Sequence, residues 1–147
     1  MTDSRMSSFE DAHGYFAKQL NAKVWELLQK TDRSKSEDEL MVHAAHASCY
    51  HWLSAGDGLN QQRSEWLVAH VYTVLGMPES AVRHAKKCLE LTQQFPELLK
   101  DYDRAYAQEC MARGLALAGN REEAKNTLPR PNKSAKPLPR RARRISL

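Results

Sequence analysis

Three side chains on one expected helix have the spacing of metal ligands. Glu39, His43 and His46 are separated by four and then three residues, which places them on one face of a helix. A metal site in a helical bundle also needs ligands from a facing helix. Glu65 and His70 are available for that role, although neither belongs to a Glu-x-x-His arrangement. The pattern therefore indicates either a histidine-based metal site or imidazoles that pack at a helix interface and hydrogen-bond a tyrosine or a carbonyl.

Arg63 and His70 form a second candidate site. An arginine followed a few residues later by a histidine resembles the motif of small helical ribonucleases of the HEPN type, in which the pair faces a dimer cleft. Here His70 lies within the most apolar stretch of the chain, which favours packing over catalysis. His51 and His84 are expected to be solvent-facing or peripheral.

Other catalytic and targeting patterns are missing from the sequence. It has no Ser-His-Asp order, no glycine-rich phosphate loop and no paired-carboxylate motif. Cys49, Cys88 and Cys110 form no C-x-x-C pair, and each lies in an expected helix, so we interpret them as small buried side chains in a reducing compartment. No apolar run suits a signal peptide or a membrane span of about 20 residues. We therefore expect a cytoplasmic, non-enzymatic protein that needs no cofactor.

The positive charge is concentrated at the C-terminal end. The chain has 147 residues and a formal net charge of +4. Residues 129–147 hold seven basic residues and no acidic one, whereas residues 1–128 hold 15 basic and 18 acidic residues, a net charge of −3. Clustered arginines bind phosphate by releasing counterions, so the tail could contact nucleic acid or anionic lipid. The candidate contacts are Arg140, Arg141, Arg143 and Arg144. The alternative is a solvated, disordered tail.

Apolar residues at helical spacing predict five or six helices. The first should open at a capping box, Ser7-x-x-Glu10, and run to about Lys30, and a second capping box, Ser36-x-x-Glu39, should open the next. The remaining helices are expected from about Asn60 to Leu75, from Pro78 to about Gln94, from about Pro96 to about Ala118, and from Asn120 to Leu128.

Two hinges repeat along the chain. Gly76 can adopt the left-handed conformation that ends a helix, and Pro78 suits the first position of the next. Gly119-Asn120 repeats this arrangement 43 residues later. Each hinge therefore predicts a tight helical hairpin.

Around these hinges the chain resembles the tetratricopeptide repeat, whose pattern is W-x2-L-G-x2-Y followed by A-x3-F. The residues at the family's positions are Val68, Ala69, Tyr72, Ala81 and Cys88 in the first unit, and Met111, Ala112, Leu115, Ala124 and Leu128 in the second. The chain departs from the family pattern in three ways. Its hinge spacing exceeds the usual ~34 residues. Trp66 stands one place later than the tryptophan of the pattern, and the closing proline is displaced to Pro96. The segment HAAHASCYHWL with the following hairpin also resembles a group of short bacterial proteins of unassigned function.

These patterns predict an all-α fold, a right-handed stack of helical hairpins with five to six helices. The helical domain should span residues 1–128, with repeat units at about 60–94 and 98–128 preceded by a hairpin at 7–56. Residues 129–147 should form a flexible, basic, proline-rich tail.

The resemblance implies a protein-interaction module. Such stacks bind peptides or proteins on the concave side formed by the first helix of each pair. The candidate groove residues are Arg63, Glu65 and His70 on one helix and Arg104, Gln108 and Arg113 on the next. Apolar helix faces at the ends of a short stack also lead us to expect a homodimer. The rival interpretations are nucleic-acid binding or HEPN-like RNA processing, and histidine-based metal binding.

Overall fold

A computed structural model describes residues 8–128, and within them the chain forms six α-helices and no strand. The prediction of an all-α stack of helical hairpins is therefore confirmed. The helices are α1 (Phe9–Leu28), α2 (Lys35–Ala55), α3 (Gly58–Val74), α4 (Pro78–Gln94), α5 (Asp101–Leu117) and α6 (Arg121–Thr127).

The first two helices start at serines other than the expected ones. The N-cap of α1 is Ser8, whose hydroxyl accepts from the Asp11 N–H at 3.1 Å, whereas the expected Ser7 lies outside the described residues. The predicted position of the capping box of α2, at Ser36, was wrong by two residues. Ser34 and Glu37 form it, through hydrogen bonds of 3.1 and 2.9 Å. An ion pair between Glu37 and Lys30 helps to favour this start, because it joins the box to the end of the preceding helix.

The boundaries of α3 and α5 also differ from the expectation by a few residues. Asp57 caps α3 and forms a capping box with Asn60, so the helix begins at Gly58 instead of near Asn60. Residues 95–100 form a turn, and α5 begins at Asp101 instead of at about Pro96. The hinges agree with the sequence: Gly76 and Gly119 adopt φ angles of +70° and +90°, the left-handed conformation that ends a helix.

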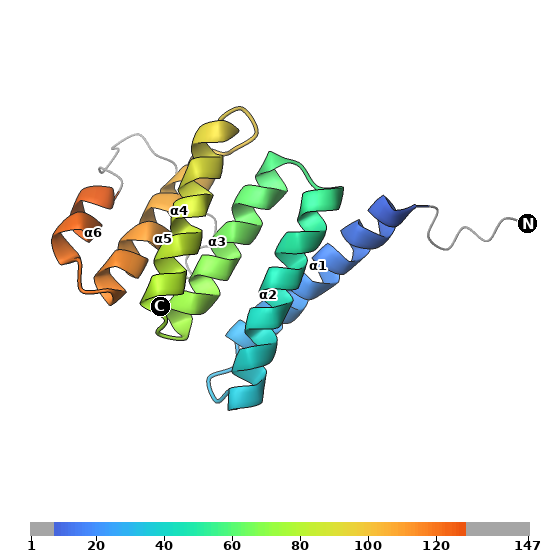
Figure 1. Cartoon of the computed structure of the whole chain (residues 1–147), viewed down its shortest axis with the longest axis horizontal. Coiled ribbons are helices and arrows are strands. Elements are labelled where there is room, and N and C mark those ends of the chain that lie inside the picture. Colours follow the sequence, from blue (N-terminus) through green and yellow to red (C-terminus); the bar gives the residue numbers. More distant parts are fainter. Residues whose placement is uncertain (1–7, 129–147) are drawn as a thin grey trace, which may run out of the picture.

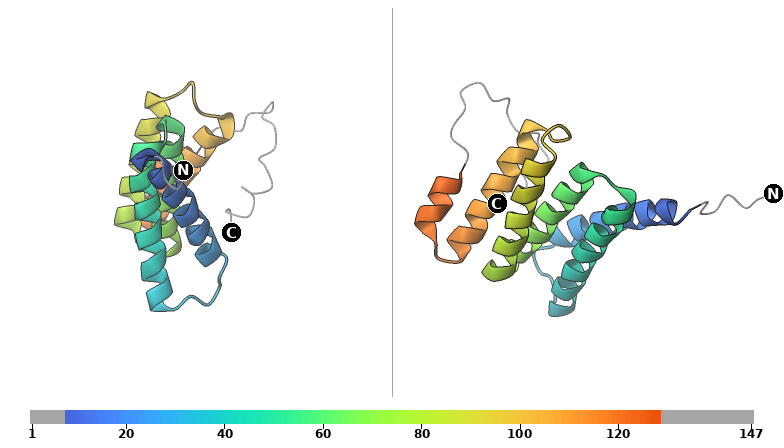
Figure 2. Two further views of the ribbon diagram at one scale, coloured as in Figure 1. Left: turned by 90° about the vertical axis from the view of Figure 1, so that its right-hand side faces the viewer. Right: turned by 45° about the horizontal axis from the view of Figure 1, so that its top comes forward.

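The helices pack in chain order, and α3 also contacts α5 (Figure 1). Seen from the end, they form a narrow layer crossed obliquely by α1 (Figure 2). Helix α3 lies in the middle, and all seven residues from Trp66 to Tyr72 are buried. The core around them contains Val24 and Leu27 from α1, Met41 from α2 and Cys88 from α4. The described part of the chain has no helix that is both long and apolar enough to cross a membrane.

Two glycines allow a matched test of how tightly the helices pack. A Cβ atom at Gly58 would lie 2.3 Å from the Phe95 ring, which covers the start of α3, whereas a Cβ atom at Gly14 in α1 would meet its nearest neighbour at 3.7 Å. We expect Gly58→Ala to lower the free energy of unfolding by about 1–3 kcal/mol, because the ring must move.

Gly14→Ala serves as the control and should raise the free energy of unfolding by about 0.5–1 kcal/mol, because alanine is the better helix former. Urea unfolding followed by circular dichroism measures both changes. Equal effects of the two substitutions would contradict the close packing of Phe95 on α3.

Candidate functional site

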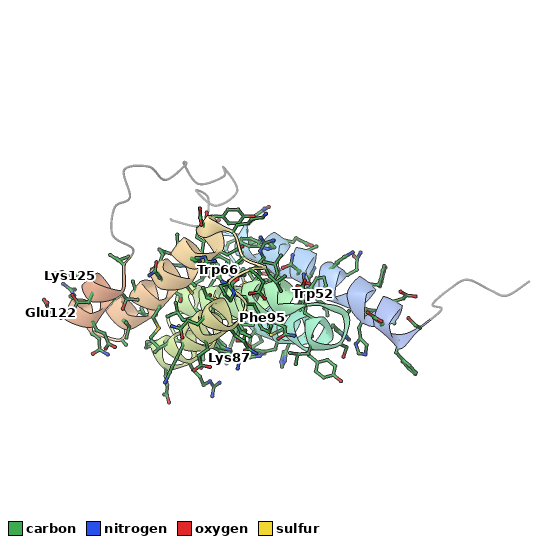
Figure 3. The ribbon with its side chains drawn as sticks, turned by 90° about the horizontal axis from the view of Figure 1, so that it is seen from above. Trp52, Trp66, Lys87, Phe95, Glu122 and Lys125 are labelled. Carbon is green, nitrogen blue, oxygen red and sulfur yellow. The ribbon has the colours of Figure 1, made fainter. Side chains whose placement is uncertain are left out.

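Aromatic side chains from three helices form a stack on one side of the layer. The Trp66 and His70 rings of α3 lie 4.9 Å apart and within 11° of parallel, and Trp25 of α1 stacks against both at 6.2 and 6.3 Å. Tyr106 of α5 approaches Trp66 at 6.0 Å, with Tyr102 beside it at 6.2 Å. In Figure 3, Trp66 lies on the side where α1 and α5 pass, whereas Lys87 of α4 lies on the opposite side. We call this side the α1/α3/α5 face.

His70 is buried within the stack. Its Nδ1 lies 3.0 Å from Arg113 Nη1, and because an arginine can only donate, Nδ1 accepts this hydrogen bond. Burial, followed by the positive charge of Arg113, lowers the pKa of His70 to about 3. The imidazole is therefore neutral at physiological pH and fixes α3 to α5. The expectation that His70 packs is met, and its ring is not an open groove side chain.

The burial of His70 predicts a pH-dependent stability. Between pH 6.5, the ordinary pKa of histidine, and about 3, the unfolded chain binds a proton at this position that the folded chain does not. The wild type should therefore lose stability as the pH falls through this range, with a contribution of up to about 1.4 kcal/mol per pH unit. His70→Asn should remove that contribution, measured as the difference in slope between the two proteins in urea unfolding from pH 7 to 4. Identical slopes would contradict a buried neutral imidazole.

Arg63 binds a buried carboxylate of α5. Its Nε and Nη2 donate to Asp103 Oδ1 and Oδ2 at 2.8 and 3.1 Å, and Asp103 is only 4% exposed. The hydrogen bonds to Asp103 raise the pKa of Arg63. Asp103 also accepts from the Lys100 N–H at 2.9 Å, and the Arg63 guanidinium lies over the Tyr102 ring at 5.6 Å. The arginine of the ribonuclease-like motif thus joins α3 to α5. The histidine of the motif, His70, is buried two helical turns further along the same face and contacts Arg113 instead.

The contribution of this ion pair can be tested at Asp103. Asp103→Ala should lower the free energy of unfolding by about 1.5–3 kcal/mol, the range for hydrogen bonds to a charged group. Asp101→Ala is the matched control, since this exposed residue lies in the same helical turn and its loss should cost less than about 1 kcal/mol. Thermal or urea unfolding measures both. A larger loss for Asp101→Ala would rule out the structural role given to Asp103.

Three polar atoms on the α1/α3/α5 face have no hydrogen-bond partner within the described residues. They are Trp66 Nε1, Tyr106 Oη and Arg113 Nη2, all of them shielded from solvent. Glu109, four residues earlier on the same helix, holds Arg113 in place through an ion pair of 2.5 Å to its Nε. Unsatisfied buried donors are costly and uncommon in folded proteins. The aromatic rings and Arg113 on this face therefore enclose hydrogen-bond donors that have no acceptor in the described part of the chain.

The predicted groove residues do not all lie on one surface. Arg63, His70 and Arg113 lie on the α1/α3/α5 face, but Glu65 extends to the opposite side of α3, where its carboxylate accepts from His84. Arg104 is exposed and donates to the Pro96 carbonyl oxygen at 2.6 Å.

Helix geometry explains the position of Arg104. It lies nine residues before Arg113, and at about 100° per residue this places the two on opposite sides of α5. Gln108, four residues after Arg104, is half-buried. The expectation of one shared surface therefore does not hold for Glu65 and Arg104.

A second polar cluster links α2, α3 and α4 on the other side of the layer. His84 Nδ1 donates to Glu65 Oε2 at 2.7 Å, and the His84 ring stacks on Tyr72 at 5.7 Å. His46 Nε2 lies 2.8 Å from Tyr72 Oη, and its ring meets that of His84 edge-on at 5.2 Å. The interpretation of His46 as an interface histidine bonded to a tyrosine agrees with this geometry. His84, expected to be peripheral, is instead a central member, and its sequence position gave no sign of this.

The Cys49 thiol is also part of this cluster. It donates to Glu65 Oε1 at 3.5 Å, and burial raises its pKa to about 11, so it stays protonated. An open pocket of about 390 Å³ lies outside the cluster. Its lining residues are Glu65, Arg83, His84, Lys86, Lys87 and Glu90.

The remaining predicted sites receive no support from the geometry. Glu39 and His43 are exposed, and the described residues contain no group of three or more ligands placed to hold a metal ion. The tail arginines, Arg140 to Arg144, lie outside the described residues. Comparison of the chain with models of protein families, with curated proteins and with solved structures finds no match.

Proposed function

We propose that the protein is a non-enzymatic interaction module that binds an extended peptide segment of a partner protein on the α1/α3/α5 face. The observation that carries this proposal is the group of unpartnered donors at Trp66, Tyr106 and Arg113. A peptide offers carbonyl and carboxylate oxygens that can accept from them after small side-chain movements. Aromatic residues and arginine are also the residue types enriched at the centres of protein interfaces.

We further propose that α3/α4 and α5/α6 are degenerate units of the tetratricopeptide type. Both hinge glycines have the left-handed conformation, and the alanines at equivalent positions after them, Ala81 and Ala124, are buried. The small Cys88 is also fully buried, at the position where the family places a small residue. In such repeats the first helices form the binding side, which corresponds here to the face containing α3 and α5.

The donors favour a particular class of peptide. The Arg63 charge is matched by Asp103 and the Arg113 charge by Glu109, so the face has no large excess of positive charge. The unpartnered donors of Trp66 and Tyr106 are neutral groups, while Arg113 Nη2 adds one charge-assisted donor. We therefore propose a partner segment with exposed backbone carbonyls and a single acidic side chain.

The Tyr106 hydroxyl provides a test that separates binding from folding. Tyr106→Phe removes a buried hydroxyl that has no partner, so the free energy of unfolding should stay the same or rise. The same change should weaken peptide binding by about 5- to 10-fold, the loss of one hydrogen bond. Peptides selected from a displayed library by the wild type supply the ligand, and calorimetry or fluorescence polarisation measures the affinities.

Ser36→Ala is the control, since this exposed serine in the first turn of α2 also loses only a hydroxyl and belongs to no proposed binding surface. It should leave both stability and affinity unchanged. Equal affinities of wild type and Tyr106→Phe for every selected peptide would overturn the proposed binding face, as would selection of no peptide.

A further inference from the structure

The apolar stripe of α1 continues beyond the stack that covers it. Its C-terminal half contributes Val24 and Leu27 to the core. The same stripe continues toward the N-terminus through Phe16 and Phe9, which are 46% and 89% exposed. Figure 1 shows the reason: this half of α1 projects past α2 at the outer end of the layer. An apolar stripe at helical spacing is normally covered by another helix.

Aromatic rings gather around this uncovered half. The Nδ1 atoms of His13 in α1 and His51 in α2 lie 2.7 Å apart and share a hydrogen bond. The centroid of the His51 ring lies 5.6 Å from that of Phe16 and 5.5 Å from that of Tyr50. Tyr15 extends the group, with its ring 5.5 Å from Phe16. A hydrogen bond between two imidazole nitrogens needs one proton and one lone pair, so the histidine pair carries at most one charge. We call Phe9, Tyr15, Phe16 and Tyr50, together with this histidine pair, the terminal aromatic patch.

The apolar area of the terminal aromatic patch is close to that of a small specific interface. Tyr15 and Tyr50 are 61% and 62% exposed, in addition to the two phenylalanines. At about 150–250 Å² for a whole aromatic side chain, the four rings expose on the order of 400–650 Å² in each copy. Complete burial of these rings would remove about 800–1,300 Å² over two copies, a range that reaches the lower limit of specific protein interfaces, about 1,200 Å².

The opposite end of the stack makes head-to-tail association unfavourable. Helix α6 ends the layer there, and its four exposed charged residues are Arg121, Glu122, Glu123 and Lys125. Glu122 and Lys125 project outward from this end in Figure 3. Pairing the aromatic patch with α6 would bury these charges against apolar rings, which is costly. Pairing the patch with the same patch on a second copy avoids that cost and closes the assembly at two copies.

We propose that two copies of this chain associate about a two-fold axis through their terminal aromatic patches. Such a dimer leaves both α1/α3/α5 faces free, so it would present two binding faces in one particle.

The mass of the full-length protein in solution tests this proposal. Sedimentation equilibrium over a wide concentration range should give twice the monomer mass of 16.8 kDa. Phe9→Gln combined with Phe16→Gln should shift the protein to monomer, with at least a 10-fold weaker dimer. Tyr50→Gln changes the patch from α2 and should weaken the dimer in the same direction.

Leu117→Gln is the control, because Leu117 is a similarly exposed apolar residue on α5, away from the patch. It should leave the mass unchanged, and circular dichroism should show the same helical content for all variants. A monomeric wild type at every concentration would overturn the proposal. So would a dimer that survives the patch substitutions, or a mass that keeps growing beyond two copies.

Discussion

The burial of the middle of α3, from Trp66 to Tyr72, is the constraint on which the rest of the structure depends. Little of this helix faces solvent, so its polar side chains bind partners on the neighbouring helices. Arg63 does so at Asp103 of α5 and Glu65 at His84 of α4, on opposite sides of the same helix. Gln62, 1% exposed, donates to Thr92 of α4 and to the backbone of α5. These contacts fix the rotation of α3 and thereby decide which residues each side of the layer presents.

The two sides of the layer therefore have different chemical properties. On the α2/α4 side, the Glu65 carboxylate accepts from a thiol and an imidazole, and the ring of His46 is tied to Tyr72. On the α1/α3/α5 face, donors at Trp66 and Tyr106 lack acceptors in the described chain. On the α2/α4 side, His84 Nε2 also lacks a partner within the described residues, but the α1/α3/α5 face has more such atoms. Unmatched buried donors lower stability unless a ligand binds. The proposed function follows from this difference.

Sequence periodicity predicted the helices well because most of them have one solvent-exposed face. The hinges at Gly76 and Gly119 were also predictable, since a left-handed residue at a helix end selects glycine. The rotation of α3 was not predictable, because its apolar residues occupy nearly every side of the helix and leave no single polar face that would reveal its orientation. For that reason Glu65 was placed with Arg63 although it points the other way.

Other errors have different causes. The opposite positions of Arg104 and Arg113 follow from their spacing alone and could have been recognised. The role of His84 depends on a residue 19 positions earlier, Glu65, and no local pattern connects them. Competing serines explain the shift at the start of α2, since Ser34 and Ser36 both have a glutamate three residues later. In the structure Glu37, the partner of Ser34, also pairs with Lys30, a contact that the local pattern does not reveal.

The stacked indoles of Trp25 and Trp66 have an optical consequence. Two indoles whose centres lie 6.2 Å apart, with planes inclined by 20°, couple their electronic transitions, and this coupling declines steeply with separation. One ring belongs to the first helix of the chain and the other to the central one, so the near-ultraviolet dichroism reports whether α1 is docked on α3. The near-ultraviolet dichroism of this tryptophan pair is thus an intrinsic probe of the contact between the first two helical hairpins.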